Sequence, residues 1–222
     1  MSPEAITPLV ISLKVALAAT LAILPPGILL GLLLARRDFP GKSIVETITS
    51  LPLVLPPTAV GYLLLRLFAR TGPLGEKTLG FDFDLLFTWK GAARASSVMA
   101  LPLVARSARV AFELVDPKLE AMGRTLGLGP VGTFTRITLP LARRGLLSAA
   151  ILGFSRAIGE FGATVIVAGN IPGRTQTLAL AIFEEMLIGH DREAMTLIGI
   201  TVMLAFAAIW SVELLLRRKP PS

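Results

Sequence analysis

Cysteine is absent from the 222-residue sequence, and histidine and tyrosine each occur once. No disulfide framework can therefore form, and a transition-metal centre or a Cys–His nucleophile pair lacks its usual residues. Charged residues are also scarce, at 17% of the chain, whereas hydrophobic residues make up 53% and the mean hydropathy is +0.72. Disorder is excluded because apolar residues dominate. This balance is typical of a membrane protein.

Long apolar runs predict an all-α, polytopic membrane protein with one membrane domain over 1–222. A helix of about 20 residues crosses the bilayer core, where lipid requires every backbone polar group to be bonded within the protein. Five runs are long enough, at 6–35, 45–69, 91–115, 141–168 and 194–216. A cleavable signal peptide is not expected, because the first run is too long and ends at Arg36-Arg37 instead of a small-residue cleavage site.

Basic residues divide unevenly between the two sides that these five runs define, with thirteen on one side and seven on the other. The thirteen are Arg36, Arg37, Lys42, Arg106, Arg109, Lys118, Arg124, Arg136, Arg143, Arg144, Arg217, Arg218 and Lys219. Because cytoplasmic loops carry the excess of Lys and Arg, we expect the N-terminus outside and the C-terminus inside. Lys14 and Arg156 lie within runs. The net charge of +7 is thus explained by the basic residues of the cytoplasmic loops, and no nucleic-acid partner is expected.

Proline and glycine fall at unusual places in these runs. Pro25-Pro26 and Pro56-Pro57 are expected to interrupt their helices, either as passive kinks or as broken helices that line a pathway. Gly27 and Gly31 form G-x-x-x-G, which permits close helix contact but is common by chance in membrane chains. A further helical stretch at 176–188 is too short and too acidic to span, so we expect it at the outer surface or dipping partway in.

Motifs that suggest catalysis do not hold up in their context. The G-x-G-x-x-G spacing at 127–132 follows no apolar strand and contains Pro130, so it predicts a turn. Gly41-Lys42-Ser43 lacks the first glycine of a phosphate-binding loop, and Ser155 near Glu160 has no histidine partner for an intramembrane hydrolase. We expect no catalytic, nucleotide or metal site on this chain.

Two polar features stand out. Arg156 and Glu160 are spaced i, i+4 inside the fourth run, where ionisable groups must be paired or wet, so they predict either an internal ion pair or a gate. The insertion at 116–140 predicts a cytoplasmic helix-turn-helix. Its Leu119, Met122 and Leu126 share one face, which suggests either a partner protein or a small cluster packed on the span ends.

This insertion resembles the cytoplasmic signature E-A-A-x3-G-x9-I-x-L-P of ABC importer permease subunits. Gly127, Ile137, Leu139 and Pro140 match its spacing, whereas Glu120 stands one residue ahead of the motif's glutamate. The resemblance implies that an ATPase contacts this segment through Leu119, Glu120, Ala121, Met122, Gly123, Leu126, Gly127, Ile137, Leu139 and Pro140.

The resemblance extends over almost the whole chain and narrows to the molybdate importer permeases. It is carried by F-P-G-K-S at 39–43, L-P-L-V-L-P-P-T-A-V-G-Y at 51–62, S-R-A-I-G-E-F-G-A-T at 155–164 and G-N-I-P-G-R-T-Q-T-L at 169–178. Sulfate permeases look similar in several of these. The resemblance implies a homodimer in a prokaryotic cell membrane, two ATPase subunits that hold ATP and Mg, an external binding protein, and no cofactor on this chain.

An oxyanion importer needs a route that tolerates negative charge. Arg156 and Glu160, with Arg66, Arg70 and Arg94, are therefore candidates for the pathway or its gate. Two other functions stay open, an ion-coupled secondary transporter with Glu160 as its carboxylate and a membrane scaffold that transports nothing. Co-purification with an ATPase would separate all three.

Overall fold

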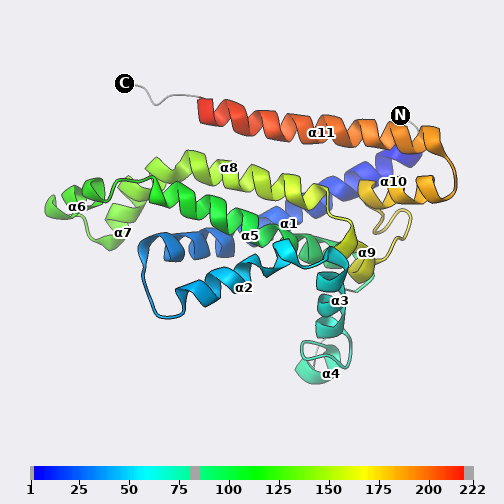
Figure 1. The fold of residues 1–222 in the computed structure, drawn as a ribbon, viewed down its shortest axis with the longest axis horizontal. Helices are drawn as coiled ribbons and strands as arrows, with labels where there is room; N and C mark the ends of the chain where they lie inside the picture. The colour runs from blue at the N-terminus through cyan, green and yellow to red at the C-terminus, as the bar shows by residue number, and fades with distance from the viewer. Residues whose placement is uncertain (1–2, 81–85, 218–222) are drawn as a thin grey trace.

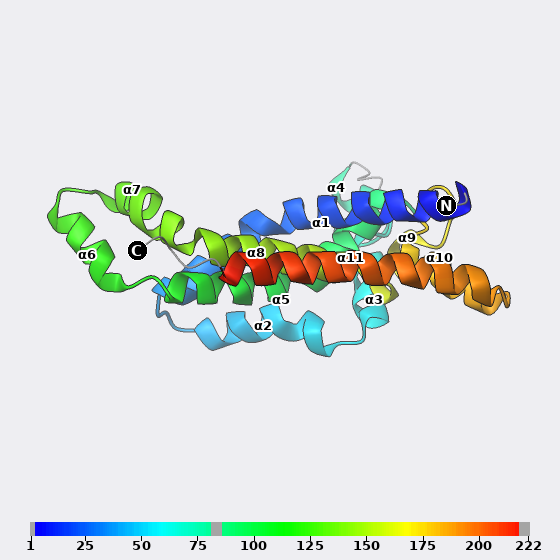
Figure 2. The same ribbon diagram turned by 90° about the horizontal axis from the view of Figure 1, so that it is seen from above.

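The computed structural model describes residues 3–80 and 86–217, and within these ranges the chain forms helices and no strand. The four longest helices are α1 (Pro3–Arg36), α5 (Trp89–Glu113), α8 (Leu139–Ile158) and α11 (Asp191–Arg217). They run roughly side by side, with α11 along the outside of the bundle (Figure 1 and Figure 2). The expected all-α architecture is confirmed.

Shorter helices lie at the two ends of this bundle and along one of its sides (Figure 1). They are α2 (Lys42–Val54), α3 (Pro57–Phe68), α4 (Glu76–Leu79), α6 (Pro117–Thr125), α7 (Pro130–Thr133), the π-helix η1 (Phe134–Thr138), α9 (Gly162–Ala168) and α10 (Leu178–Leu187). In Figure 1, α6 and α7 project from one end, whereas α10 and the N-terminus lie at the other. The helix expected at 176–188 is α10, which attaches to α1 where the Leu178 N–H donates to Ser12 Oγ at 2.7 Å.

Helix α5 forms the centre of the bundle, because small residues let its neighbours approach closely. Most of its buried residues are Ala, Ser or Gly, and both α1 and α8 pack against it. A Cβ at Gly27 would lie 2.8 Å from Val104 Cγ1, and one at Gly31 would lie 2.8 Å from Ala108 Cβ. The G-x-x-x-G spacing therefore marks a real helix contact.

Three helical stretches in the described ranges are long and apolar enough to cross a membrane, at 6–36, 130–158 and 191–211. The bent pair α2 and α3 would add a fourth. Helix α5 covers the third predicted run, but its many Ala, Ser and Arg residues make it less apolar, which suits a helix enclosed by others. The five-span count stays a prediction, and two residues used for orientation, Arg218 and Lys219, lie outside the described residues.

The helix breaks differ from expectation at two of three places. Pro56-Pro57 does break the second run, with α2 and α3 meeting at 111°. Pro25-Pro26 does not interrupt α1, because both prolines lie on its exposed side while Gly27 packs against α5. The fourth run, predicted as one helix over 141–168, ends at Ile158 and resumes in α9. Its break falls between Gly159 and Gly162, and a Cβ at Gly162 would lie 2.8 Å from Pro57 Cβ.

Candidate functional site

The predicted helix-turn-helix is present and projects from one end of the bundle (Figure 1). Asp116 caps α6, since its Oδ1 accepts a hydrogen bond from the Lys118 N–H at 2.8 Å, and Pro117 occupies the first turn. After a turn, α7 and η1 lead into α8 without a gap. From Pro130 onward, the segment is therefore helical without interruption as far as the end of α8.

Gly127 makes the turn between α6 and α7. Its φ of +88° is left-handed, a conformation that glycine adopts without steric cost. The Leu128 N–H bonds to the Gly123 carbonyl at 3.0 Å and the Gly127 N–H bonds to the Arg124 carbonyl at 3.1 Å, which is a Schellman cap. The G-x-G-x-x-G spacing is thus a turn, as predicted.

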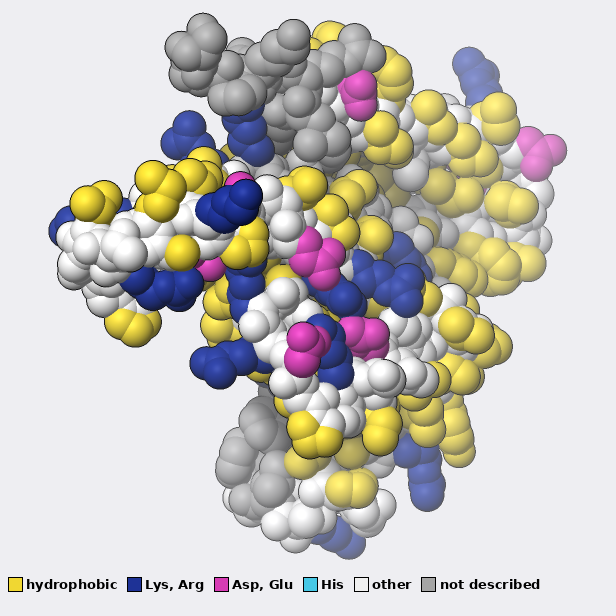
Figure 3. All heavy atoms as spheres, turned by 60° about the vertical axis from the view of Figure 1, so that its left-hand side comes forward, with side chains coloured by type: hydrophobic (Ala, Val, Ile, Leu, Met, Phe, Trp, Pro, Cys, Tyr) yellow, Lys and Arg dark blue, Asp and Glu magenta, His cyan; other side chains and the backbone are white. Residues whose placement is uncertain are grey.

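The apolar face of α6 has no packing partner within the described chain. Leu119, Met122 and Leu126 are all exposed, and Ala121 is exposed beside them. Figure 3 shows hydrophobic side chains on this projecting segment, interspersed with Lys and Arg. The alternative prediction, in which these residues pack on the span ends, is wrong. An exposed apolar face at the tip of a projection is typical of a docking surface.

The opposite side of α6 holds the segment to the bundle. Gly123 is buried, and a Cβ there would overlap the end of the Ile137 side chain. Glu120 also turns inward, and its Oε1 accepts hydrogen bonds from Arg36 Nη2 and Thr138 Oγ1, each at 2.7 Å. Arg36 reaches the Val115 carbonyl as well, at 3.3 Å. Glu120 thus ties α6 to the end of α1 and to η1.

Arg156 and Glu160 form the predicted ion pair, with 2.7 Å between Arg156 Nη1 and Glu160 Oε2. Glu160 lies in the break between α8 and α9, and its Oε1 accepts a hydrogen bond from the Ala163 N–H at 2.9 Å. The carboxylate therefore caps α9 while it neutralises the arginine. The carboxylate is almost completely enclosed, whereas the arginine is partly open to its surroundings.

The other three pathway candidates lie outside this pair. Arg66 is exposed in the last turn of α3 and Arg94 is exposed near the start of α5. Arg70 is exposed and bonds to Glu76 at 2.9 Å. The contacts given for the Glu160 carboxylate are those to Arg156 and to the Ala163 N–H, and the three other arginines lie on other segments of the chain.

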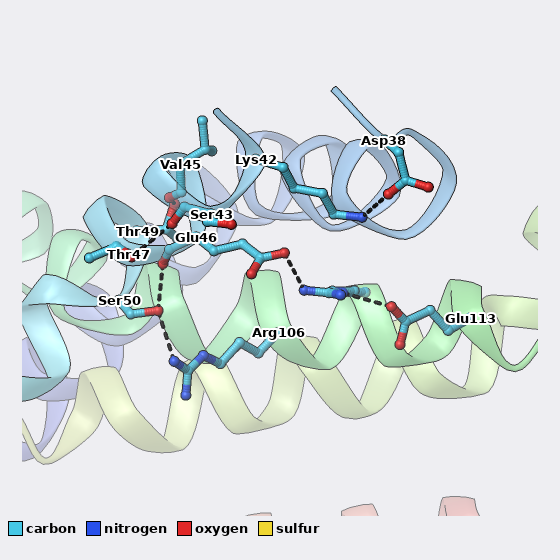
Figure 4. A network of polar contacts seen from close by, with 11 residues as sticks. Asp38, Lys42, Ser43, Val45, Glu46, Thr47, Thr49, Ser50, Arg106 and Glu113 are labelled. Carbon is cyan, nitrogen blue, oxygen red and sulfur yellow. Dashed lines mark hydrogen bonds and ion pairs between the residues drawn. The ribbon is translucent and has the colours of Figure 1, made fainter. Parts of the chain in front are cut away.

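A second charged network joins α2 to α5 and was not predicted. The Arg109 guanidinium bonds to both Glu46 and Glu113, each at 2.7 Å. Figure 4 shows this network, in which Arg106 donates to Ser50 Oγ at 2.8 Å. A cavity of about 390 Å³ opens beside these residues. The i, i+4 spacing of Glu46 and Ser50, facing the i, i+3 spacing of Arg106 and Arg109, is the signal that could have revealed it.

A further ion pair lies at the start of α2 and the loop before it. Lys42 Nζ donates to Asp38 Oδ1 at 2.8 Å, and this hydrogen bond lowers the pKa of the Asp38 carboxyl. Helix α2 has no buried residue, so its polar contacts with α5 are a principal part of its attachment. No three Asp, Glu or His residues in the described ranges gather closely enough to hold a metal ion.

Comparison with known proteins places this arrangement in a family. Residues 27–219 match the family described as the binding-protein-dependent transport system inner membrane component. The molybdenum transport system permease protein ModB of Escherichia coli (strain K12) is 43% identical over 209 residues, which span 93% of this chain and 91% of that protein. The sulfate transport system permease protein CysW of Synechococcus elongatus is 34% identical over 184 residues, which span 83% and 63%.

Solved structures of low sequence identity share the fold. A chain of an amino acid ABC transporter with histidines aligns with a TM-score of 0.68 at 16% identity, over 98% of this chain and 95% of that one. A chain of the MetNI methionine ABC transporter aligns with a TM-score of 0.68 at 19% identity, over 97% and 99%. Since the family pattern covers most of the chain and the curated relatives match nearly all of it, the protein belongs to the family of inner membrane components of binding-protein-dependent transport systems.

Proposed function

We propose that this protein is the transmembrane permease subunit of an ATP-driven importer of molybdate. The observation that carries the proposal is the projecting helix α6, whose exposed Leu119, Met122 and Leu126 lie on a segment continuous with α8. A separate ATPase subunit covers this face, and two copies of the permease assemble with two ATPases. ATP and Mg bind to the ATPases, and this chain contributes no catalytic group.

Movement of α6 reaches the bundle by two routes. One runs along the chain, through α7 and η1 into α8, whose far end carries Arg156. The other crosses through space, from Glu120 to Arg36 at the end of α1. Nucleotide binding to the ATPases biases the permease between two conformations, and the loaded binding protein biases the same equilibrium from outside.

The pathway runs past the two broken helices. Helices α3 and α9 meet closely, since a Cβ at Gly61 would lie 2.9 Å from Ala163 Cα. Broken helices that meet inside a membrane protein offer backbone groups and helix ends to a passing ion. Arg156, beside this junction, lowers the barrier for a dianion, and Glu160 keeps the arginine neutralised when no anion is present.

The cargo is inferred from the relatives. The relatives named as molybdenum permeases are 35% to 43% identical over more than nine-tenths of this chain, whereas the sulfate permeases are 34% identical over 71% to 83% of it. Tungstate should also be carried, because it is a tetrahedral dianion of nearly the same size as molybdate. Selectivity rests mainly on the binding protein, because a route built for rapid passage cannot also bind tightly.

The test is uptake by the reconstituted importer with its ATPase and binding protein. Molybdate should enter and stimulate ATP hydrolysis at concentrations where sulfate does neither. Met122→Asp should abolish co-purification of the ATPase, whereas Lys118→Gln on the same helix should leave it intact. Sulfate uptake alone would overturn the cargo, and gradient-driven uptake without the ATPase would overturn the importer itself.

The orientation needs a separate experiment, which the absence of native cysteine makes simple. We propose that α6 is cytoplasmic and that the N-terminus and Glu76 are external. A membrane-impermeant thiol reagent added to intact cells should label Glu76→Cys and should not label Thr125→Cys. Labelling in the reverse pattern would invert the topology.

A further inference from the structure

Lys14 is a charge that neither the fold nor the proposed transport cycle accounts for. It is the one charged residue between Glu4 and Arg36, about 16 Å into α1 at 1.5 Å per residue. An ionisable side chain in such an apolar helix is costly unless it is paired or hydrated, so it points to a functional site. In the part of the chain that the structure describes, the Lys14 ammonium has no carboxylate partner.

The contact that Lys14 does make is with an aromatic ring. Its Nζ lies 3.9 Å from the centre of the Trp89 ring, at the start of α5. A cation held over an aromatic face is positioned without being neutralised, so its positive charge stays available to an anion. Trp89 also reports on this position, because the chain has two tryptophans and the other, Trp210, is on α11.

Lys14 and Trp89 line a cavity of about 400 Å³ between α1, the start of α5 and the loop before α10. Lys90 and Arg174 line the same cavity, so three cationic side chains from three segments surround one space. No aspartate or glutamate stands among the described residues of its lining. Cationic side chains gathered around one space favour an anion there, and about 400 Å³ has room for a tetrahedral oxyanion and several waters.

The loop that carries Arg174 is held rigidly. Thr175 is fully buried, and its Oγ1 accepts a hydrogen bond from the Ile171 N–H at 3.0 Å and donates to the Gly169 carbonyl at 3.1 Å. Glu184 of α10 accepts a hydrogen bond from Asn170 Nδ2 at 2.7 Å. Arg174 is therefore presented on a preformed turn, and a guanidinium fork suits an oxyanion with two oxygens in reach.

We propose that this cavity binds a tetrahedral oxyanion group through Lys14 and Arg174. The group is either a free dianion in solution or the phosphate of an anionic phospholipid at the membrane surface. The site lies at the end of the molecule away from α6 (Figure 1), and the proposal does not depend on which oxyanion the importer carries. Binding draws the Lys14 ammonium away from the Trp89 ring.

The test follows Trp89 fluorescence in a Trp210→Phe background, with the protein in nanodiscs of phosphatidylcholine. Sodium sulfate is titrated against sodium chloride at constant ionic strength. A free-anion site gives a saturable change in emission, and Lys14→Met and Arg174→Gln each raise the half-saturating concentration at least tenfold. Arg192→Gln, which removes an exposed cation elsewhere, leaves the titration unchanged.

A second arm replaces part of the phosphatidylcholine with phosphatidylglycerol. A lipid site gives the emission change on adding this lipid, together with phosphatidylglycerol that stays bound in native mass spectrometry and is lost from both variants. Arg174→Gln alters a surface loop residue, so it reports even if Lys14→Met folds poorly. The proposal is overturned if neither sulfate nor phosphatidylglycerol changes Trp89 emission, or if Arg174→Gln responds like the parent. It is also overturned if sodium acetate, titrated in the same way, gives the same emission change as sulfate.

Discussion

Several arginine–glutamate pairs among the described residues have the same distance of 2.7 Å between nitrogen and oxygen, and three of them, which hold different parts of the fold, differ in burial. The glutamate side chain is 1% exposed in the pair of Arg156 and Glu160, 13% in that of Arg36 and Glu120, and 36% in that of Arg109 and Glu46. The energetic role of an ion pair depends on its solvation more than on its distance. We therefore expect the stability lost on replacing one partner to follow the burial of the three pairs.

The largest effect is expected at the Arg156 and Glu160 pair. Arg156→Met leaves an unpaired carboxylate enclosed at the start of α9, which should cost roughly 3 kcal/mol. Glu160→Gln should cost less, since glutamine can still accept from the Ala163 N–H and Arg156 is 29% exposed. Unfolding in mixed detergent micelles measures both.

The double variant decides whether these two residues act as a unit. Arg156→Met combined with Glu160→Gln should lose less stability than the sum of the single losses, because no isolated charge is left. A gating role would show as altered ATP hydrolysis or leak at normal expression. Additive losses would contradict a coupled pair.

The Arg36 and Glu120 pair should show an intermediate effect, confined to α6. Glu120→Gln removes the charge that holds Arg36, and we expect the attachment of α6 to weaken by about 1–2 kcal/mol. Hydrogen exchange should become faster in α6 and stay unchanged in α5. Lys118→Gln is the matched control on the same helix, and equal protection of α6 in both variants would show that Glu120 does not anchor it.

These two pairs also show what sequence could and could not reveal. Arg156 and Glu160 are four residues apart, so helical periodicity alone predicted their contact. Arg36 and Glu120 are 84 residues apart, and their contact depends on how α1, α6 and η1 meet. The sequence predicted the helix of α6 and placed Leu119 on its apolar face, but it left open whether that face is exposed and could not show that Glu120 turns inward.

In the fold as well, features set by local sequence patterns could be predicted, whereas those set by contacts between distant segments could not. Apolar runs placed the long helices correctly because burial in lipid or protein requires them. The break at 159–161 was missed because the apolar run continues across it, although Gly159 and Gly162 flank it and Gly162 is needed for the contact with Pro57. At Pro25-Pro26 a local rule left either a kink or a break open, and packing through Gly27 and Gly31 keeps α1 continuous.

Substitution of Gly127 should lower stability less than loss of the Arg156–Glu160 or Arg36–Glu120 pair. It should nevertheless have a clear effect on the coupling of ATP hydrolysis to transport. Nothing lies within 4 Å of a Cβ placed there, so a substitution meets backbone strain alone. Gly127→Ala should cost about 1 kcal/mol and lower the transport gained per ATP hydrolysed, whereas Gly127→Asn should be tolerated because asparagine adopts the left-handed region more readily. Identical coupling in the alanine and asparagine variants would argue against a role for the turn geometry.

The smallest effect is expected at Glu46, in the most exposed of the three pairs. Glu46→Gln should change stability by no more than about 0.5 kcal/mol, because solvent screens the charge and Arg109 keeps its second partner, Glu113. The loss should shrink further in high salt, whereas the effect of Arg156→Met should barely respond to salt. A Glu46→Gln effect as large as that of Arg156→Met, measured in the same micelles, would show that burial does not rank these pairs. It would instead make the contact between α2 and α5 a principal support of the fold.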